Sequence, residues 1–385
     1  MTATIRTLRV HRVALPLVRP FVTAVRSTNR LDTAIVEAVD SDGRSGWGEA
    51  PVSWRVTGQS LQSIAAVVHG PFLETVRGRV VSDLAMLCDD LARSAVHNQA
   101  ARSAVECALH DLAAQQVGIP LFQLLGAGHT AAGLPVTATD MTLSATADID
   151  GLVEAACGHV AAEFTTLKVK VGIGDDVNAL TEVRAAVGSD IVLRVDANQA
   201  WQPKQAVAII RQWEDLGLGI QFVEQPVAAQ SLDALAWVTD RVETPIVADE
   251  SVWSARDLLE VLRRRAADLV NIKLAKTGGL REAARLVAIA QASDVGVLVG
   301  CMMESRVGIS AAASFVASAG AATGVARAWG VRVSDTVHDL DAGLWTDASA
   351  VRGGAEYDGR WIIPSVEAGL GIRGVASDTV FEADL

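Results

Sequence analysis

Six short apolar segments of this chain each end in a charged side chain, and they follow one another at nearly constant spacing. The charged residues are separated by 26, 28, 25, 24 and 31 residues and are Lys170, Asp196, Glu224, Asp249, Lys273 and Glu304. A strand followed by its crossover helix takes about 30 residues, so each interval fits one strand–helix unit. The regular spacing predicts parallel strands whose C-terminal ends meet at one rim.

The number of such units favours a closed barrel over residues 131–345. Seven strand candidates alternate with amphipathic segments such as QAVAIIRQWEDLG, and they read VTATDMTL, TLKVKV, IVLRVDAN, IQFVEQP, PIVADES, LVNIKLA and VGVLVGCM. The segment TVHDLDAGLW is the candidate for an eighth strand. Alternation of strand and helix is typical of a parallel α/β sheet, and this many repeats can close it.

Residues 1–130 show a different order of elements. The segments IRTLRVHRVAL and LDTAIVEAVDSDG alternate apolar and polar residues, and Asp42-Gly43 supplies a turn between strands. Helical spacing follows over about 61–125. Strands followed by helices predict a separate α+β domain. The tail, about 346–385, has the pattern of strands and loops, and we expect it to return to this domain.

Composition excludes several kinds of partner. The formal net charge is −12 and half of the 385 residues are apolar, so a basic face for nucleic acid is not expected. The uncharged stretch 307–326 is rich in Ala, Ser and Gly and poor in Leu and Ile, which fits a packed helix better than a membrane span. Four cysteines without a CxxC pair and an N-terminus without a continuous apolar segment indicate a cytoplasmic protein. With nucleic acid and membrane set aside, the expected partner is a small-molecule substrate.

Three acidic residues lie at the ends of consecutive predicted strands. A single one of Asp196, Glu224 and Asp249 would be read as a strand-end cap or a salt-bridge partner. Three carboxylates that meet at one rim repel one another unless a cation neutralises them. Oxygen ligands without His or Cys select Mg²⁺, or alternatively Mn²⁺, over Zn²⁺. The pattern therefore predicts a divalent metal site.

Lysines flank this predicted site. Lys168 and Lys170 are two residues apart on one strand, so both point to the same face, and Lys273 comes from the strand four positions later. Lys170 and Lys273 would then face each other across the metal. Surface positions are the alternative, but both lysines stand in apolar strand contexts. A nearby cation and burial lower the pKa of a lysine and make it available as a base.

A divalent metal and two opposed bases define a class of reaction. A substrate carboxylate bound to the metal acidifies its α-proton, and the metal stabilises the enediolate that forms. One lysine can remove the proton from one face of the carbon, and the other can return it to the opposite face. A barrel that keeps only the fold, without catalysis, is the alternative from a different class, and the intact lysines and acids argue against it.

The segments KVKVG, VDANQAW, VEQP, ADES, NIKLAKTGGL and CMMES, together with GWGEAP near the N-terminus, resemble the muconate-lactonizing subgroup of the enolase superfamily. The resemblance implies a modified (β/α)7β TIM barrel under an N-terminal α+β capping domain, one Mg²⁺ per subunit and a homo-oligomer. It also implies roles for six residues: Asp196, Glu224 and Asp249 as metal ligands, Lys170 and Lys273 as the acid/base pair, and Lys168 as a support for the substrate carboxylate and for the pKa of Lys170.

Within this subgroup the sequence is most similar to the dipeptide epimerases. Asp339-Leu340-Asp341 resembles the pair of carboxylates that holds the free ammonium of a dipeptide, and paired acids suit a cation. PFVTAVRST followed by GEAPVSWRVTGQS resembles the capping loop of Ala-Glu epimerases, where the arginine that matches Arg26 takes an acidic side chain. N-succinylamino acid racemase, o-succinylbenzoate synthase and muconate-type cycloisomerase remain alternatives.

Further candidates come from the strand ends. Thr139 is expected to contact the substrate backbone, and Cys301 and Met303 are expected to line the pocket or to pack in the core. Three other polar residues end predicted strands at the same rim: Asn198, Glu250 and Glu304. The segment GVARAWGVRVSDT before the Asp339-Leu340-Asp341 motif is longer than the resemblance leads us to expect, and it could shift the eighth strand.

Overall fold

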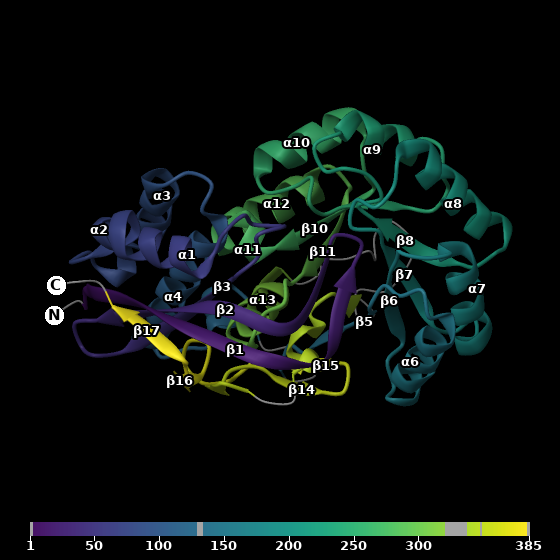
Figure 1. The fold of residues 1–385 in the computed structure, drawn as a ribbon. Coiled ribbons are helices and arrows are strands. Elements are labelled where there is room, and N and C mark those ends of the chain that lie inside the picture. The colour runs from purple at the N-terminus through teal and green to yellow at the C-terminus, as the bar shows by residue number, and fades with distance from the viewer. Residues whose placement is uncertain (1–2, 129–133, 320–336, 347–348, 383–385) are drawn as a thin grey trace.

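The computed structural model describes residues 3–128, 134–319, 337–346 and 349–382. Figure 1 shows two parts side by side: an N-terminal sheet with helices, in purple and blue, and a larger ring of strands and helices, in teal and green. The segment GVARAWGVRVSDT lies outside the described residues.

The N-terminal part is built on an antiparallel sheet in the order β17-β1-β2-β3. Its strands are β1 (Ile5–Thr23), β2 (Arg26–Asp40), β3 (Ser45–Pro51) and β17 (Thr379–Glu382). The predicted turn at Asp42-Gly43 joins β2 and β3, and Gly43 has a φ of 82°, which glycine adopts without strain. The helices are α1 (Leu61–Val67), α2 (Leu73–Val76), α3 (Leu84–Ser94), α4 (Gln99–Val117) and α5 (Leu121–Leu124), and a π-helical turn (Val68–Phe72) and a 3₁₀ turn (Val81–Asp83) connect α1, α2 and α3.

Helix α4 is buried along most of its length because β3 lies directly on it. Gly48 of β3 sits so close that a Cβ there would lie 1.9 Å from the carbonyl oxygen of Ala104 in α4. Gly46 is equally tight, with 2.2 Å to the carbonyl oxygen of Ala108. The glycines of GWGEAP therefore serve close packing of a sheet on a helix.

The larger part contains seven parallel strands in the order β11-β10-β9-β8-β7-β6-β5. They are β5 (Met141–Leu143), β6 (Thr166–Lys170), β7 (Val192–Asp196), β8 (Ile220–Glu224), β9 (Ile246–Ala248), β10 (Leu269–Lys273) and β11 (Gly296–Gly300). β12 (Val337–His338) pairs in parallel with β4 (Thr137–Thr139), and Asp339 bridges to Gly300 of β11. These contacts close the ring and confirm the predicted modified TIM barrel.

Helices follow the barrel strands and cover their outer face (Figure 1). They are α6 (Ile149–Ala161), α7 (Asp176–Val187), α8 (Pro203–Asp215), α9 (Leu232–Thr239), α10 (Ala255–Arg264), α11 (Leu274–Thr277), α12 (Leu280–Ala292) and α13 (Arg306–Ala319). Among the described residues, no helix is both long and apolar enough to cross a lipid bilayer.

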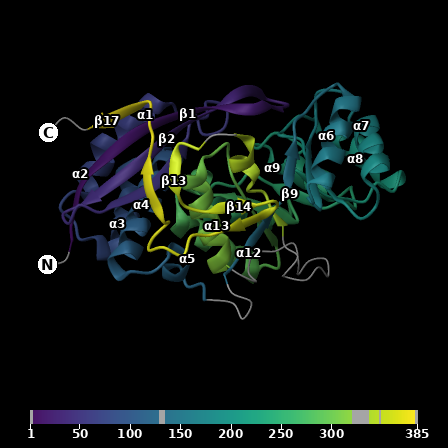
Figure 2. The same ribbon diagram turned by 90° about the horizontal axis from the view of Figure 1, so that it is seen from below.

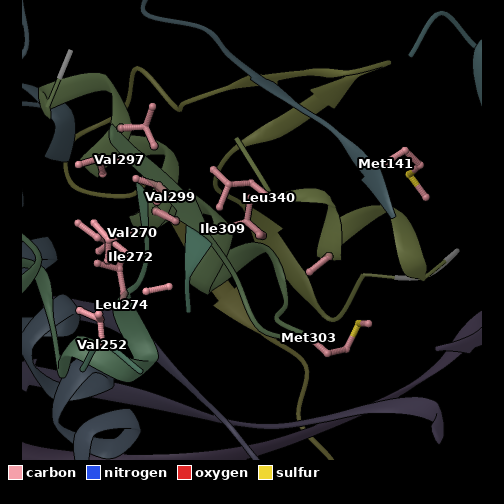
Figure 3. Close-up of a cluster of buried hydrophobic side chains, with 14 of the residues drawn as sticks. Met141, Val252, Val270, Ile272, Leu274, Val297, Val299, Met303, Ile309 and Leu340 are labelled. Carbon is pink, nitrogen blue, oxygen red and sulfur yellow. The ribbon is translucent and has the colours of Figure 1, made fainter. Parts of the chain in front are cut away.

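Alternation along each strand decides which side chains reach the site. Val270 and Ile272 of β10 join Val297 and Val299 of β11 in the apolar cluster of Figure 3. Asn271 lies between Val270 and Ile272, and Lys273 follows Ile272. Both side chains therefore point to the opposite face, into the barrel. The apolar residues therefore fix the strand register that aims the polar ones.

The C-terminal tail connects the two parts, as Figure 2 shows in yellow. Its strands are β13 (Val351–Gly353), β14 (Glu356–Asp358), β15 (Trp361–Ile363), β16 (Ile372–Val375) and β17. β15 pairs with β4 of the barrel, whereas β17 pairs with β1. We propose residues 1–130 and 131–345 as the two domains, with the tail contributing strands to both.

The contact between β3 and α4 gives a stability prediction. Gly48→Ala would force β3 away from α4, because the obstructing atom belongs to the backbone, and it should lower the free energy of unfolding by about 1–3 kcal/mol. Gly158→Ala is the control, since Gly158 is exposed in α6 and a Cβ there meets nothing within 4 Å; alanine should leave stability unchanged or raise it. Urea unfolding followed by circular dichroism measures both, and equal effects would contradict the packing argument.

Candidate active site

The three predicted acidic residues lie together at one rim of the barrel. Asp196 and Glu224 end the adjacent strands β7 and β8 and are paired in register, and Asp249 follows β9 directly. All three are buried. Parallel strands in register deliver their last residues to the same level, which explains why acids from three sequence segments meet.

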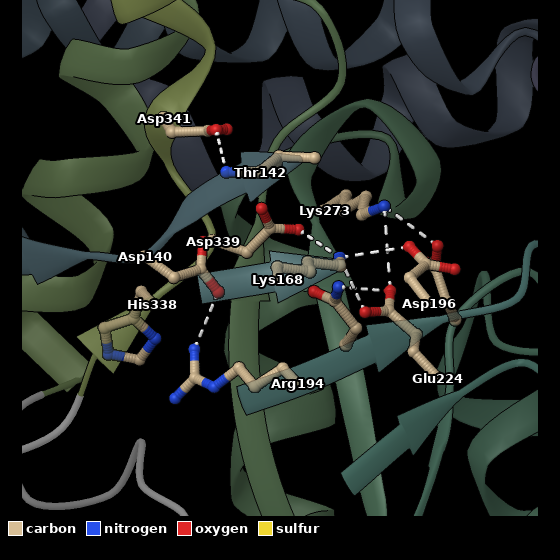
Figure 4. Close-up of polar contacts among 12 residues, drawn as sticks. Asp140, Thr142, Lys168, Arg194, Asp196, Glu224, Lys273, His338, Asp339 and Asp341 are labelled. Atoms are coloured by element: carbon tan, nitrogen blue, oxygen red, sulfur yellow. Dashed lines mark hydrogen bonds and ion pairs between the residues drawn. The ribbon is translucent and has the colours of Figure 1, made fainter. Parts of the chain in front are cut away.

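Lys168 lies at the centre of this charge cluster (Figure 4). Its Nζ atom is 2.7 Å from Glu224 Oε2, 3.1 Å from Asp196 Oδ2 and 2.7 Å from Asp339 Oδ2. Burial opposes the charged form of Lys168, but these carboxylates outweigh burial and raise its pKa well above its usual value. Lys168 is therefore a fixed positive charge that joins β6, β7, β8 and the segment after β12.

Lys170 and Lys273 stand on opposite sides of the acids. Lys170 Nζ lies 2.6 Å from Asp196 Oδ2, and Lys273 Nζ lies 2.8 Å from Asp249 Oδ2. Their strands β6 and β10 are separated in the sheet by β7, β8 and β9, so curvature of the barrel lets them face the acids from two walls.

The sequence led us to expect a lowered pKa for the basic lysines beside a bound cation, and the carboxylates that face Lys273 act in the opposite direction. Burial disfavours the charged form of Lys273, but the carboxylates of Asp249 and Glu224 outweigh burial and raise its pKa above its usual value. The carboxylates that face Lys273 therefore control its protonation. Any change in their charge changes the pKa of this lysine.

The chemistry of the rim fits a hard divalent cation. Burial and the charge of Asp196 raise the pKa of Glu224 to about 7, a sign that these negative charges are incompletely balanced. The Oε2 atom of Glu250 and the Oδ1 atom of Asn198 are buried and have no hydrogen-bond partner among the described residues. Carboxylate and amide oxygens are the ligands that Mg²⁺ prefers.

Two buried side chains beside the acids were not predicted from the sequence. Lys276 Nζ lies 2.5 Å from Asp249 Oδ1 and also donates to the Asp249 carbonyl oxygen. Asn271 donates its Nδ2–H to Glu224 Oε1 at 2.8 Å. The only signal for Lys276 was its position three residues after Lys273, which by itself equally fits an exposed helix residue.

A cavity above the acids, the central cavity, has walls from both parts of the chain. Phe21, Thr23, Val25, Arg26 and Val56 come from the N-terminal part. The barrel contributes residues that include most of the predicted site: Lys170, Asn198, Asp249, Glu250, Lys273, Cys301, Met303, Asp339 and Asp341. Arg26 is half-buried, and burial lowers the pKa of its guanidinium. Its Nη1–H donates to Ser53 Oγ, with 3.4 Å between Nη1 and Oγ.

Five predicted site residues do not belong to this lining: Lys168, Asp196, Glu224, Thr139 and Glu304. Thr139 accepts a hydrogen bond from the backbone N–H of Leu340 and donates to the carbonyl oxygen of Asp140. It therefore holds the eighth strand, and Thr142 takes the position in the cavity wall that we expected for Thr139. The Glu304 carboxylate accepts a hydrogen bond from the backbone N–H of Met302 at 2.8 Å.

Glu304 instead belongs to the contact between the two parts of the chain. Glu49 of β3 accepts hydrogen bonds from the Ser305 backbone N–H and hydroxyl and from the Gly308 N–H at the start of α13. Burial, and then the charge of Glu49, raise the pKa of Glu304 to about 8. A helix N-terminus attracts a carboxylate, so Glu49 fastens the cap to the barrel.

The two aspartates after β12 have different environments. Asp339 is paired with Lys168, and the surrounding lysines lower its pKa despite burial. Asp341 accepts the backbone N–H of Thr142 and the indole N–H of Trp345, and burial and the charge of Asp339 raise its pKa. Both line the cavity, so one wall of it is acidic.

Comparison with known protein families identifies the family to which both parts of the chain belong. Residues 5–126 match the family model "Mandelate racemase / muconate lactonizing enzyme, N-terminal domain", and residues 151–374 match "Enolase C-terminal domain-like". The chain belongs to the mandelate racemase/muconate lactonizing enzyme family. The superfamily predicted from the sequence motifs is thereby confirmed.

Several dipeptide epimerases are among the proteins that the chain resembles. The L-Ala-D/L-Glu epimerase of Bacillus subtilis is 39% identical over 372 residues, which is 96% of each chain. A substrate-liganded structure of the Bacillus subtilis enzyme superposes with a TM-score of 0.89 over 97% of this chain and 99% of that chain. A dipeptide epimerase from Enterococcus faecalis, solved with Mg and the dipeptide L-Leu-L-Tyr, is 33% identical, with a TM-score of 0.86 over 97% and 99% of the chains.

The raised pKa of Glu304 predicts how stability depends on pH. Because its pKa is about 8 in the folded protein and about 4.3 in an unfolded chain, the folded state holds the proton more tightly, and stability falls as pH rises toward 8. Glu304→Gln removes this contribution, so its melting temperature should fall less than that of the wild type between pH 6.5 and 8.5. The buried histidines His110 and His338 have lowered pKa values and do not titrate in that window. Calorimetry in EDTA measures the two slopes, and identical slopes would contradict the assignment.

Proposed function

We propose that this protein is a Mg²⁺-dependent dipeptide epimerase of the Ala-Glu type, an isomerase that inverts the α-carbon of the second residue. The observation that carries this proposal is the cavity itself. Lys170 and Lys273 approach from strands on opposite sides of the acid cluster, and Asp339 and Asp341 form an acidic wall of the same space. The similarity to several dipeptide epimerases supports the choice of substrate class.

The lysines carry the proton transfer in this proposal. One ε-amine removes the α-proton from one face of the carbon, and the opposed ε-ammonium delivers a proton to the other face. Two bases on opposite walls make the reaction reversible and invert the centre without rotation of the substrate. Burial excludes water that would otherwise exchange with the transferred proton.

Asp196, Glu224 and Asp249 would hold the metal, and Glu250 and Asn198 lie beside it with unpaired oxygens. Mg²⁺ bound there supplies positive charge that neutralises these acids and stabilises the negative charge developing on the substrate carboxylate. Lys168 keeps Asp196 and Glu224 in place and adds a fixed positive charge below them. The solved Enterococcus faecalis relative contains Mg, which supports Mg²⁺ as the ion.

The acidic wall favours a substrate with a free amine. Asp339 and Asp341 would receive the α-ammonium of the first residue, and Arg26 on the opposite, cap side of the cavity would receive an acidic side chain of the second. The substrates of an N-succinylamino acid racemase, an o-succinylbenzoate synthase or a muconate-type cycloisomerase bring a second carboxylate instead of an ammonium, and two carboxylates repel it.

We also propose that the protein acts in the cytoplasm as a homo-oligomer. Among the described residues the cysteines are free thiols, which fits a reducing compartment. The oligomer is proposed on the family resemblance.

Isotope exchange tests the reaction. In D₂O, L-Ala-L-Glu should take up one α-deuterium in its glutamate residue and become a mixture of epimers, whereas N-succinyl-L-glutamate should not react. Lys170→Ala and Lys273→Ala should each abolish epimerisation, and each should keep exchange with only one of the two epimers, because one base still faces the α-proton. Mass spectrometry and chiral chromatography measure both. Epimerisation that survives in both variants, or equal turnover of the acylated compound, would exclude the proposal.

Metal binding is testable without activity. Adding Mg²⁺ at about 100 times its Kd to EDTA-treated protein should raise the melting temperature by about 5 °C, because the ion binds only the folded state. Glu224→Gln should reduce this shift strongly, whereas Glu154→Gln, at an exposed position of α6, should leave it unchanged. A wild-type melting temperature indifferent to Mg²⁺ would show that the acids do not hold the ion.

A further inference from the structure

The tip of β1 rests on one buried tryptophan of the barrel. The Arg19 guanidinium lies 4.5 Å from the centre of the Trp345 ring, and the Phe21 ring meets the same indole edge-on with 5.0 Å between centroids. Arg19 is held by a second contact, 3.0 Å from its Nη2 to His159 Nε2 of α6. Cation–π and edge-to-face contacts are both directional, so the position of the hairpin depends on this indole.

The same indole also holds one wall of the central cavity. Trp345 ends the short 3₁₀ turn Asp341–Trp345, and its Nε1–H donates to Asp341 Oδ2 at 3.0 Å. The backbone N–H of Thr142 in β5 donates to the same oxygen at 2.8 Å (Figure 4). Asp341 lines the cavity, whereas Trp345 is fully buried behind it.

Two N–H donors on one carboxylate oxygen fix the rotation of that side chain. Hydrogen bonds to a charged acceptor are shorter and stronger than neutral ones, and an unpaired buried carboxylate would be costly. Asp341 is therefore held in one orientation before any ligand arrives. Preorganisation of this kind reduces the entropy lost on binding.

Phe21 extends the connection to the rest of the cavity. Its ring lies 5.7 Å from the Lys170 Nζ and 5.7 Å from the Arg26 guanidinium. The indole of Trp345 thus contacts the Phe21 ring, which lies beside Arg26, and it also donates a hydrogen bond to the Asp341 carboxylate in the acidic wall. Both ends of a bound dipeptide would be placed relative to it.

We propose that Trp345 is a positioning residue for recognition of the substrate's free amine: it holds Asp341 toward the cavity and seats the β1 tip over it. This inference rests on the proposed function. Trp345 touches no substrate, but in this proposal it contributes to the selectivity for free-amine dipeptides over N-acylated compounds. The hydrogen bond of Trp345 goes to Asp341, and Trp345 is connected to Lys170 only through the Phe21 ring, so the change is expected in binding and not in proton transfer.

Trp345→Phe isolates the indole N–H, because phenylalanine keeps an aromatic ring for Arg19 and Phe21. Loss of one hydrogen bond to a charged carboxylate should raise KM for L-Ala-L-Glu about 10-fold, with kcat within about twofold of the wild type. The inhibition constant of N-propionyl-L-glutamate, which lacks the amine, should not change. Trp361→Phe is the matched control, since Trp361 also carries an arginine on its ring, Arg360 at 5.0 Å, but its indole has no hydrogen bond to Asp341.

Arg19→Gln provides a second variant that leaves the core intact, and it should raise KM severalfold with kcat retained. Melting temperatures near that of the wild type establish that the variants fold. For Trp345→Phe, equally weakened binding of the dipeptide and the propionyl analogue would overturn the inference alone, and so would a loss confined to kcat. An unchanged KM in both variants of an active enzyme would also overturn it. A wild-type protein that neither epimerises nor binds the dipeptide would overturn the proposed function and this inference with it.

Discussion

The structure depends on the mutual compensation of charges that are buried inside the barrel. Lys168, fully enclosed, touches carboxylates from β7, β8 and the segment after β12. Removing one member of such a cluster leaves its partners charged and without solvent, which is far more costly than losing an exposed ion pair. The rim is therefore held together as a unit, and its geometry is fixed before a ligand enters.

This compensation also sets the chemistry. The carboxylates that would bind a metal are the groups that face the lysines, so charge at the metal site and protonation of the lysines are linked. Lys276 adds to this link, because its Nζ contacts both the side chain and the backbone carbonyl oxygen of Asp249. The same contacts thus serve stability and hold the groups to which the proposed mechanism assigns proton transfer.

In the proposed function, the cap adds to the selectivity that the acidic wall of the barrel provides. The cap reaches the barrel through the Glu49 carboxylate at the start of α13 and through the β1 tip on Trp345. Arg26 enters the cavity from this cap. If the barrel carries the proposed reaction and the cap contacts the substrate side chain, the two can vary separately, which fits relatives that are named for different dipeptides.

The sequence by itself determined the barrel, the α+β part and the convergence of Asp196, Glu224, Asp249, Lys170 and Lys273, because strand period and unit spacing are local properties of the chain. Only the tertiary structure decided what depends on distances between segments remote in sequence. It buried Lys276 against Asp249, set Thr139 against Leu340 instead of in the cavity, and raised the pKa of Lys273 through facing carboxylates. Side-chain partners and dielectric surroundings arise from packing, and no pattern along one strand contains them.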